Sequence, residues 1–381
     1  MTLCLAAVAS CALPLGGEAG AAGRLTVIAR DLNNPRKLFL APSGALYVAE
    51  AGAGGRDRCL GSGANRACIG LTGSITEIAH GAQRRVVVGL ASVATLDEQR
   101  AAGPADVVVR NGRYEVLLQD IAMNGRGDNG LGRDGKTLGA VVTTAPGLAK
   151  PQVVASLAAY EAAHNPDHGA GPGRAYGNPP VDSDPYAFTP YRGGLAVVDA
   201  AGNDLLWVSP KGAVSVLAVF PTQTVRLTAA DRRRFGIPPG VASLTVQSVP
   251  SSVVVGPDGA LYVGELTGVP FRRGLARVWR IAPGGKPTVY ASGLTNVSDV
   301  AFLGKSLLVL EIAAAGLGAP PSPGVLIRID RGGRRTVLAS RGLSDPTGLA
   351  VDSGAIYITN HGTSPGAGPG PHGQVVRLST G

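Results

Sequence analysis

The chain lacks several features that common protein classes require. Only 16% of its 381 residues are charged and 4% are aromatic. Beyond the N-terminal segment, no apolar run reaches the 18 residues that a membrane-spanning helix needs. The His-Glu-x-x-His motif is missing, and the Gly-x-Ser-x-Gly spacing occurs only in the Gly- and Pro-rich run Gly362–Gly366, whose composition does not favour the helix that a nucleophile elbow opens. The sequence therefore argues against a membrane span in the mature chain, a nucleophile-elbow hydrolase and a zinc peptidase.

The net charge of +9 comes mainly from scattered arginines, such as Arg84-Arg85 and Arg334-Arg335. Aromatic residues do not alternate with them, and no nucleic-acid-binding motif accompanies them. We therefore interpret the basic residues as solvated turns and expect no nucleic-acid partner. The five histidines lie in predicted turns or loops, and His164 and His168 form the only close pair.

Turn-forming residues are abundant, with 56 glycines and 28 prolines. The stretch Pro250–Glu265 predicts a strand, a Gly-Pro-Asp-Gly turn and a second strand that ends at a carboxylate. The same pattern recurs along the chain at Pro35–Glu50, Val297–Glu311 and Pro346–Asn360. Internal repeats at roughly 40–50 residues are typical of propellers.

Each hairpin is followed by a second strand pair, as in Ala276–Leu294 and Gly324–Leu343. The repeat is therefore a four-stranded meander, and radial packing would bury its apolar faces. Counting blades predicts six, which start at Pro35, Pro104, Pro185, Pro250, Val297 and Pro346.

The two ends of the mature chain complement each other. The last repeat stops after its third strand, Gln374–Leu378, whereas Leu25–Ala29 resembles an isolated fourth strand. We predict that these segments pair and close the ring, which removes an open sheet edge. The expected fold is all-β: a single six-bladed β-propeller of four-stranded antiparallel blades over residues 24–381, which we expect to be monomeric.

The N-terminal segment, residues 1–23, resembles a bacterial secretory signal, although no basic residue precedes its apolar stretch. Val8-Ala9-Ser10-Cys11 also resembles a lipobox, so lipid anchoring is the alternative to a secreted or periplasmic protein. Cys59 and Cys68 are the cysteines of the mature chain and flank a Gly-rich loop. We predict that they form a disulfide in an oxidising compartment.

The long insertions fall on one face of the predicted propeller, which we call the elaborated face; loops on a rigid scaffold commonly carry function. One of them, Pro221–Val249, predicts a short helix over Thr228–Phe235. The aligned ends of the second strands also lie on this face, and they are candidate ligand-binding residues: Glu50, Asp199, Glu265, Glu311 and Asn360. The alternative is that these side chains cap backbone N–H groups.

Nearer the axis, the innermost strands of blades two and five carry Asp106 and Asp299. These blades face each other across a six-bladed ring. Carboxylates without histidine or cysteine favour Ca²⁺ or Mg²⁺ over zinc. The pair is therefore a candidate axial metal site, although a catalytic cation needs more ligands than these two.

Several segments resemble the ScyD/ScyE family, which is named after genes of cyanobacterial sunscreen-pigment clusters. They are Asn34-Pro35-Arg36, Gly256–Glu265, Glu265–Pro270, His164–Asp167, Asp184–Tyr186 and Asp199–Leu206. The repeats are also similar to NHL repeats, most closely in blade three. The resemblance covers the mature chain and implies an exported six-bladed propeller, but it supplies no catalytic residues.

Two function classes follow from the sequence. The first is a non-catalytic exported scaffold that binds a small molecule, a glycan or a protein through the elaborated face. The second is a divalent-metal-dependent hydrolase, similar to a lactonase, that uses the axial carboxylates. Fold alone does not separate them, because propellers perform both roles.

Overall fold

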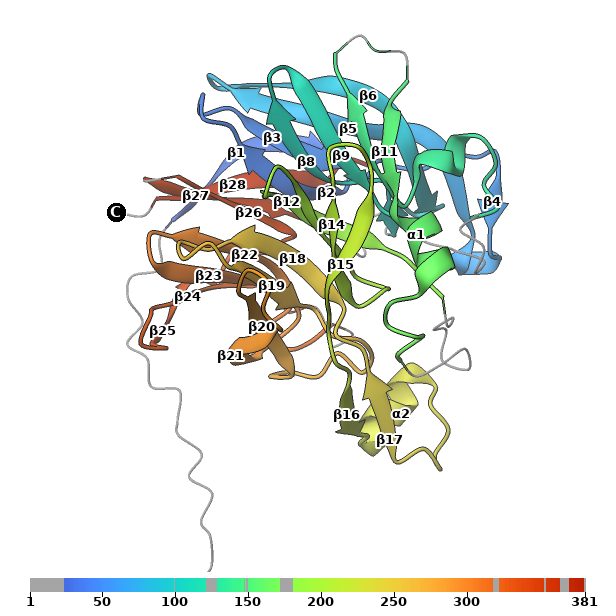
Figure 1. Ribbon diagram of the computed structural model, residues 1–381, viewed down its shortest axis with the longest axis vertical. Coiled ribbons are helices and arrows are strands. Elements are labelled where there is room, and N and C mark those ends of the chain that lie inside the picture. Colours follow the sequence, from blue (N-terminus) through green and yellow to red (C-terminus); the bar gives the residue numbers. More distant parts are fainter. Residues whose placement is uncertain are drawn as a thin grey trace, which may run out of the picture.

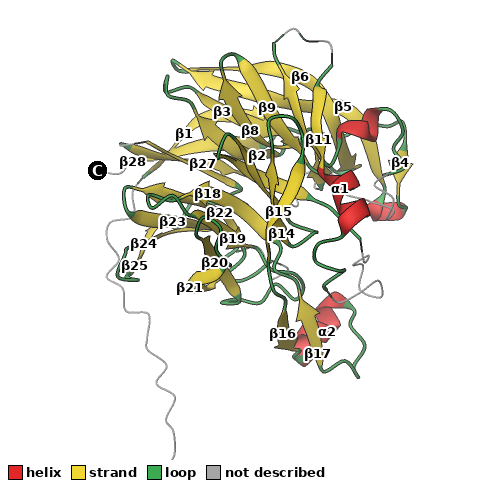
Figure 2. Ribbon diagram, viewed as in Figure 1, coloured by secondary structure: helices red, strands yellow, loops and turns green. Residues whose placement is uncertain are grey.

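A computed structural model describes residues 24–98, 100–120, 129–146, 148, 150–171, 181–317, 322–352, 354–363 and 370–379. The predicted signal segment, with Cys4 and Cys11, lies outside these residues. The described strands form seven antiparallel sheets, six of which are arranged around a common axis (Figures 1 and 2). The predicted all-β six-bladed propeller is therefore confirmed.

These six sheets follow one another in sequence order, and each runs outward from the axis. Blade one comprises β2 (Pro35–Leu40), β3 (Leu46–Glu50), β5 (Ala67–Ala79) and β6 (Ala82–Thr95). Blade two comprises β8 (Pro104–Arg110), β9 (Arg113–Leu118), β10 (Ala140–Thr144) and β11 (Gln152–Ser156). Blade three comprises β12 (Pro185–Tyr191), β13 (Gly194–Asp199), β14 (Asp204–Val208) and β15 (Val214–Val219). Blade four comprises β18 (Pro250–Val255), β19 (Leu261–Glu265), β20 (Ala276–Ile281) and β21 (Thr288–Leu294). Blade five comprises β22 (Val297–Leu303), β23 (Ser306–Glu311), β24 (Val325–Ile329) and β25 (Arg335–Ala339).

Blade six joins the two ends of the chain. It consists of β26 (Gly348–Asp352), β27 (Ala355–Asn360), β28 (Gly373–Ser379) and the N-terminal strand β1 (Leu25–Leu32). In the register of this pair, Leu25 lies opposite Leu378 and Val27 opposite Val376. The predicted closure is confirmed: β1 provides the fourth strand that the last repeat lacks (Figure 1).

The apolar cores lie between neighbouring blades, because the inner strands are apolar on both faces. In β19, Leu261 and Val263 pack in the cluster shared with blade three, whereas Tyr262 between them packs in the cluster shared with blade five. Successive side chains of a strand point to opposite faces of the sheet, so one short strand serves two cores. Each blade is thereby held by both of its neighbours.

Blade one is larger than the repeat predicts. Strands β5 and β6 pair as far as Ala67 and Thr95, so their hairpin is much longer than the corresponding β20–β21 pair of blade four. The short strands β4 (Cys59–Leu60) and β7 (Ala101–Ala102) pair with β5 and β6, and the 3₁₀ helix η1 (Gly63–Asn65) follows β4. The predicted disulfide is confirmed, since Cys59 is bonded to Cys68 across the β4–β5 pair.

The insertions carry the helices, which lie on the same side of the molecule as β4 (Figure 1). Helix α1 (Leu157–His164) follows blade two and was not predicted; a 3₁₀ helix, η2 (Asp134–Thr137), lies in the insertion before β10. Helix α2 (Ala229–Phe235) confirms the predicted short helix, and Thr228 caps it. It packs with a hairpin, β16 (Gln223–Arg226) and β17 (Ser243–Val246), around a small core of its own.

No helix among the described residues is long and apolar enough to cross a membrane.

Candidate functional site

The five side chains predicted at the second-strand ends are all buried, and each accepts a hydrogen bond from the segment just ahead of the first strand of its own blade. The distances are 2.6 Å from Asn33 N to Glu50 Oε2, 2.7 Å from Asp184 N to Asp199 Oδ1, 2.7 Å from Ser248 Oγ to Glu265 Oε1, 2.8 Å from Thr295 N to Glu311 Oε1 and 2.8 Å from Ser344 N to Asn360 Oδ1. These bonds satisfy donors that burial would otherwise leave unpaired. The structure thus places the five residues together on the elaborated face as caps, and ligand contact by any of them stays a prediction.

Blades one and four neutralise this carboxylate with an arginine. Glu265 accepts from Arg277 Nε and Nη2, each at 2.8 Å, and from Trp279 Nε1 at 2.8 Å. Glu50 accepts from Arg85 Nη2, also at 2.8 Å. A buried carboxylate that is paired and fully hydrogen-bonded holds its blade together and has little left to offer a ligand.

Blade three surrounds the equivalent carboxylate with other carboxylates. Asp199 accepts from the backbone of its own turn, while Asp182, Asp184, Asp204 and Glu161 lie near it. Burial, together with the neighbouring negative charges, raises the pKa of Asp182 to about 7 and that of Glu161 to about 8. Within the described ranges, no lysine or arginine forms an ion pair with any member of this group. We call Glu161, Asp182, Asp184, Asp199 and Asp204 the blade-three carboxylates.

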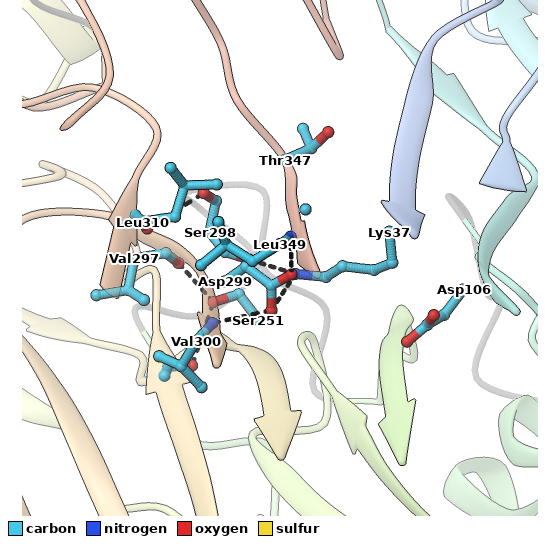
Figure 3. Close-up of polar contacts among 12 residues, drawn as sticks. Lys37, Asp106, Ser251, Val297, Ser298, Asp299, Val300, Leu310, Thr347 and Leu349 are labelled. Atoms are coloured by element: carbon cyan, nitrogen blue, oxygen red, sulfur yellow. Dashed lines mark hydrogen bonds and ion pairs between the residues drawn. The ribbon is translucent and has the colours of Figure 1, made fainter. Parts of the chain in front are cut away.

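At the axis, Lys37 extends toward Asp299, and Asp106 lies on its other side (Figure 3). Lys37 Nζ is 3.2 Å from Asp299 Oδ1 and also donates to the carbonyl of Ser298. Burial lowers the pKa of Lys37 and raises that of Asp106 to about 7. The axis therefore contains one ammonium group between two carboxylates.

Both axial carboxylates also join neighbouring blades. Asp106 Oδ2 accepts from Phe188 N of blade three at 2.9 Å, and Asp299 Oδ2 accepts from Leu349 N of blade six at 2.7 Å. In the part of the chain that the structure describes, no three His, Cys, Asp or Glu side chains are grouped so that they could hold a metal ion. The axial Ca²⁺ or Mg²⁺ site stays a prediction, and Lys37 occupies the position where such a cation would approach Asp299.

A pocket of about 780 Å³ lies between the 221–249 insertion and blades three and four. Its wall is largely apolar and is contributed by Phe235, Ile237, Leu244, Val246, Val269 and Phe271. Asp182 and Asp184 supply its carboxylates. A volume of this size and a mainly apolar wall with a few polar groups are typical of small-molecule sites.

Thr267 adds a polar group with an unusual conformation to this pocket. Its φ is +69°, which a β-branched residue rarely adopts, and its Oγ1 is buried without a hydrogen-bond partner. Strained backbone and unpaired buried groups concentrate at functional sites. The combination marks the pocket as the strongest candidate binding site in the described structure.

Sequence reasoning did not identify Asp182, Thr267 or Asp204 as members of a site. The position of Asp204 could have been predicted from the sequence, because Asp199 and Asp204 flank the short turn of blade three and such positions face each other in a hairpin. The pocket could not have been predicted in this way, since the insertion that forms its wall has no counterpart in the other repeats.

No protein-family model and no curated protein sequence matches the chain. Among solved structures, the chain is similar to a streptogramin B lyase, with 11% identity over 93% of this chain and 97% of that chain and a TM-score of 0.47. It is also similar to regucalcin, a calcium-binding protein from Agrobacterium tumefaciens strain C58, with 12% identity, coverage of 94% and 93%, and a TM-score of 0.49. A third similar structure is the PQQ-bound aldose sugar dehydrogenase of Streptomyces coelicolor, with 12% identity over 95% of this chain and 99% of that chain and a TM-score of 0.45.

These likenesses carry no argument about activity. The strand topology alone assigns the chain to the all-β six-bladed propellers. The resemblance to the ScyD/ScyE family stays a prediction.

Proposed function

We propose that the protein is a binding propeller whose ligand is a small amphipathic molecule with a positively charged end. The pocket between the 221–249 insertion and blades three and four is the observation that carries this proposal. It combines an apolar wall with two carboxylates, Asp182 and Asp184, and with the buried hydroxyl of Thr267.

The charge preference follows from the surroundings of the two carboxylates. Asp184 receives a hydrogen bond from Gln119 Nε2 at 3.2 Å, but its strongest charged neighbour is Asp199, another carboxylate. Burial and this repulsion make ionisation unfavourable, and a bound cation would offset both costs. A cationic ligand therefore gains more in this pocket than a neutral ligand of the same shape.

The hydrolase alternative has no comparable support. It requires a divalent cation at Asp106 and Asp299, but Lys37 lies against Asp299 and both carboxylates already accept backbone N–H groups. The pocket also favours a small molecule over a glycan, because glycan sites present more hydrogen-bonding groups than this apolar wall offers.

The proposal also includes export of the protein from the cytoplasm. The Cys59–Cys68 disulfide supports an extracytoplasmic location, since such bonds persist in oxidising compartments. The predicted signal in residues 1–23 points the same way. We propose that the mature chain acts in the periplasm or outside the cell.

Calorimetry with three matched probes tests the binding proposal. Tryptamine carries an ammonium group, tryptophol is its neutral analogue and indole-3-propionate is anionic. We expect the amine to bind at least tenfold more tightly than the alcohol, and the anion to bind least. The result that none of the three binds at millimolar concentration, or that the anion binds best, contradicts the proposal.

A double variant locates the site. Asp182→Asn with Asp184→Asn removes the pocket carboxylates, and we expect it to abolish the preference for the amine over the alcohol. Asp258→Asn with Asp330→Asn is the matched control, because it removes the same charge from two partly exposed carboxylates that do not line the pocket. Equal loss of preference in both variants would assign the effect to net charge instead of the pocket.

A further inference from the structure

Three buried carboxylate oxygens, two on Asp204 of blade three and one on Glu161 of α1, have no hydrogen-bond partner in the described structure. Asp204 is fully buried, at 0% exposure, and neither of its oxygens accepts a hydrogen bond. Glu161 is 2% exposed, and its Oε1 is likewise unpaired. A buried polar group without a partner is costly, and an unpaired carboxylate is more costly still.

The other buried acids among the described residues do not share this condition. Asp199, which lies opposite Asp204 across the β13–β14 turn, accepts four hydrogen bonds, from Ser183, Asp184, Ala201 and Gly202. The unpaired oxygens therefore belong to two specific residues and are not a general feature of the elaborated face.

The two residues lie on separate elements, and their negative charges repel each other. Asp204 begins β14, and Glu161 projects from α1, whose N-terminus is capped by Ser156. A Cβ placed on Gly202 would lie 3.3 Å from Glu161 Oε2 and 3.3 Å from Asp199 Cγ, so α1 brings Glu161 against the turn of blade three. Packing of the helix on the blade thus concentrates negative charge that nothing in the described structure neutralises.

We infer that Asp204 and Glu161 are the side-chain ligands of a hard divalent cation, of which Ca²⁺ is the best match. Carboxylates without nitrogen or sulfur ligands select such ions. Because no larger group of His, Cys, Asp or Glu could hold the ion by itself, water and backbone carbonyls complete its coordination. Ca²⁺ accepts these ligands in variable number and geometry. The ion would also fasten α1 to blade three, and this inference is independent of the pocket ligand.

The alternative is that the unpaired carboxylates hold protons. Burial and neighbouring carboxylates raise the pKa of both Glu161 and Asp204, which fits either a proton or a cation. The two explanations differ in one measurable respect, since only the cation makes stability depend on metal concentration.

The test is titration of the EDTA-dialysed full-length mature protein with CaCl₂ and, separately, MgCl₂, followed by calorimetry and by thermal unfolding. We expect one ion to bind per chain and the Tm to rise with Ca²⁺ concentration. Glu161→Gln and Asp204→Asn should each weaken binding at least tenfold. Glu161→Gln alters a side chain of α1 and leaves the strands of blade three unchanged, so it serves if Asp204→Asn does not fold.

Two controls make the result specific. Glu311→Gln removes a buried carboxylate of blade five and should leave Ca²⁺ affinity unchanged. Asp106→Asn with Asp299→Asn removes the axial carboxylates and should also leave it unchanged. The inference is overturned if the parent protein binds neither ion, or if the axial variant loses binding while Asp204→Asn and Glu161→Gln retain it. In the first case the carboxylates hold protons, and in the second the ion lies at the axis.

Discussion

Blades three and four place a carboxylate at the same position but give it opposite electrostatic surroundings. In blade four, Glu265 meets Arg277 and Trp279 of β20. In blade three, Asp199 lies opposite Asp204 of β14, and the two are joined by a turn that contains no basic residue. Residues directly opposite each other in a hairpin interact most strongly, and like charges there are destabilising.

The repeat therefore specifies the hydrogen-bonding position of the carboxylate but not the charges that surround it. Both carboxylates fasten the segment ahead of their first strand, Asp199 through the backbone N–H of Asp184 and Glu265 through the hydroxyl of Ser248. One cross-strand neighbour then decides whether the position is a closed ion pair or part of an acidic cluster. The electrostatic surroundings in blade five are intermediate, because Glu311 faces Val325 and has neither an arginine nor a carboxylate directly opposite.

The largest effect is expected from removing the blade-four carboxylate. Glu265→Ala leaves Arg277, Trp279 and Ser248 with unpaired buried donors, and we expect it to lower the free energy of unfolding by about 3–5 kcal/mol. Urea unfolding measures the change. As a control, Glu115→Ala breaks the partly exposed pair with Arg110 and should cost under about 1 kcal/mol. Similar losses in both variants would show that Glu265 is no more than a surface ion pair.

Blade five should show an intermediate effect that depends on pH. Burial raises the pKa of Glu311 from its ordinary 4.5 to about 7, so the folded protein binds this proton more tightly than the unfolded chain does. The resulting stability is complete below about pH 4.5 and is lost as the pH rises through about 7.

Glu311→Gln imitates the protonated side chain and keeps an acceptor for Thr295 N. It should stabilise the protein by about 2 kcal/mol at pH 8 and leave it nearly unchanged at pH 4. Thermal unfolding at the two pH values checks this prediction. A variant that is destabilised at pH 8 would mean that the ionised carboxylate is favoured in the folded state.

The smallest effect is expected in blade three. Asp199→Asn loses part of the hydrogen bonding to Ser183 and to the turn, but it also relieves repulsion from Asp184 and Asp204. Because these changes oppose each other, we expect a net loss of about 1 kcal/mol in urea unfolding. A loss as large as that of Glu265→Ala would remove the contrast between the two blades.

The fold was largely predictable because its determinants are local or repeated. Alternating apolar residues and Gly-rich turns indicate the hairpins, and the isolated strand at Leu25–Ala29 indicates closure. The extended β5–β6 hairpin and α1 were missed, since each lies in a segment that departs from the repeat. The capping alternative for the second-strand carboxylates was also open from the sequence, and its hydrogen bonds are present.

Strand periodicity and repeat alignment were enough to predict the blades, the closure of the ring and the aligned positions at the second-strand ends, and cysteine usage was enough to predict the disulfide, because none of these depends on knowledge of distant contacts. Which carboxylate lies against a basic side chain depends on the packing of the folded chain. Lys37 reaches Asp299 across the axis, and Glu161 reaches the turn beside Asp199 through the docking of a helix. Such pairs are far apart in sequence, and the electrostatic environment of each depends on burial and on neighbours that only the folded chain brings together.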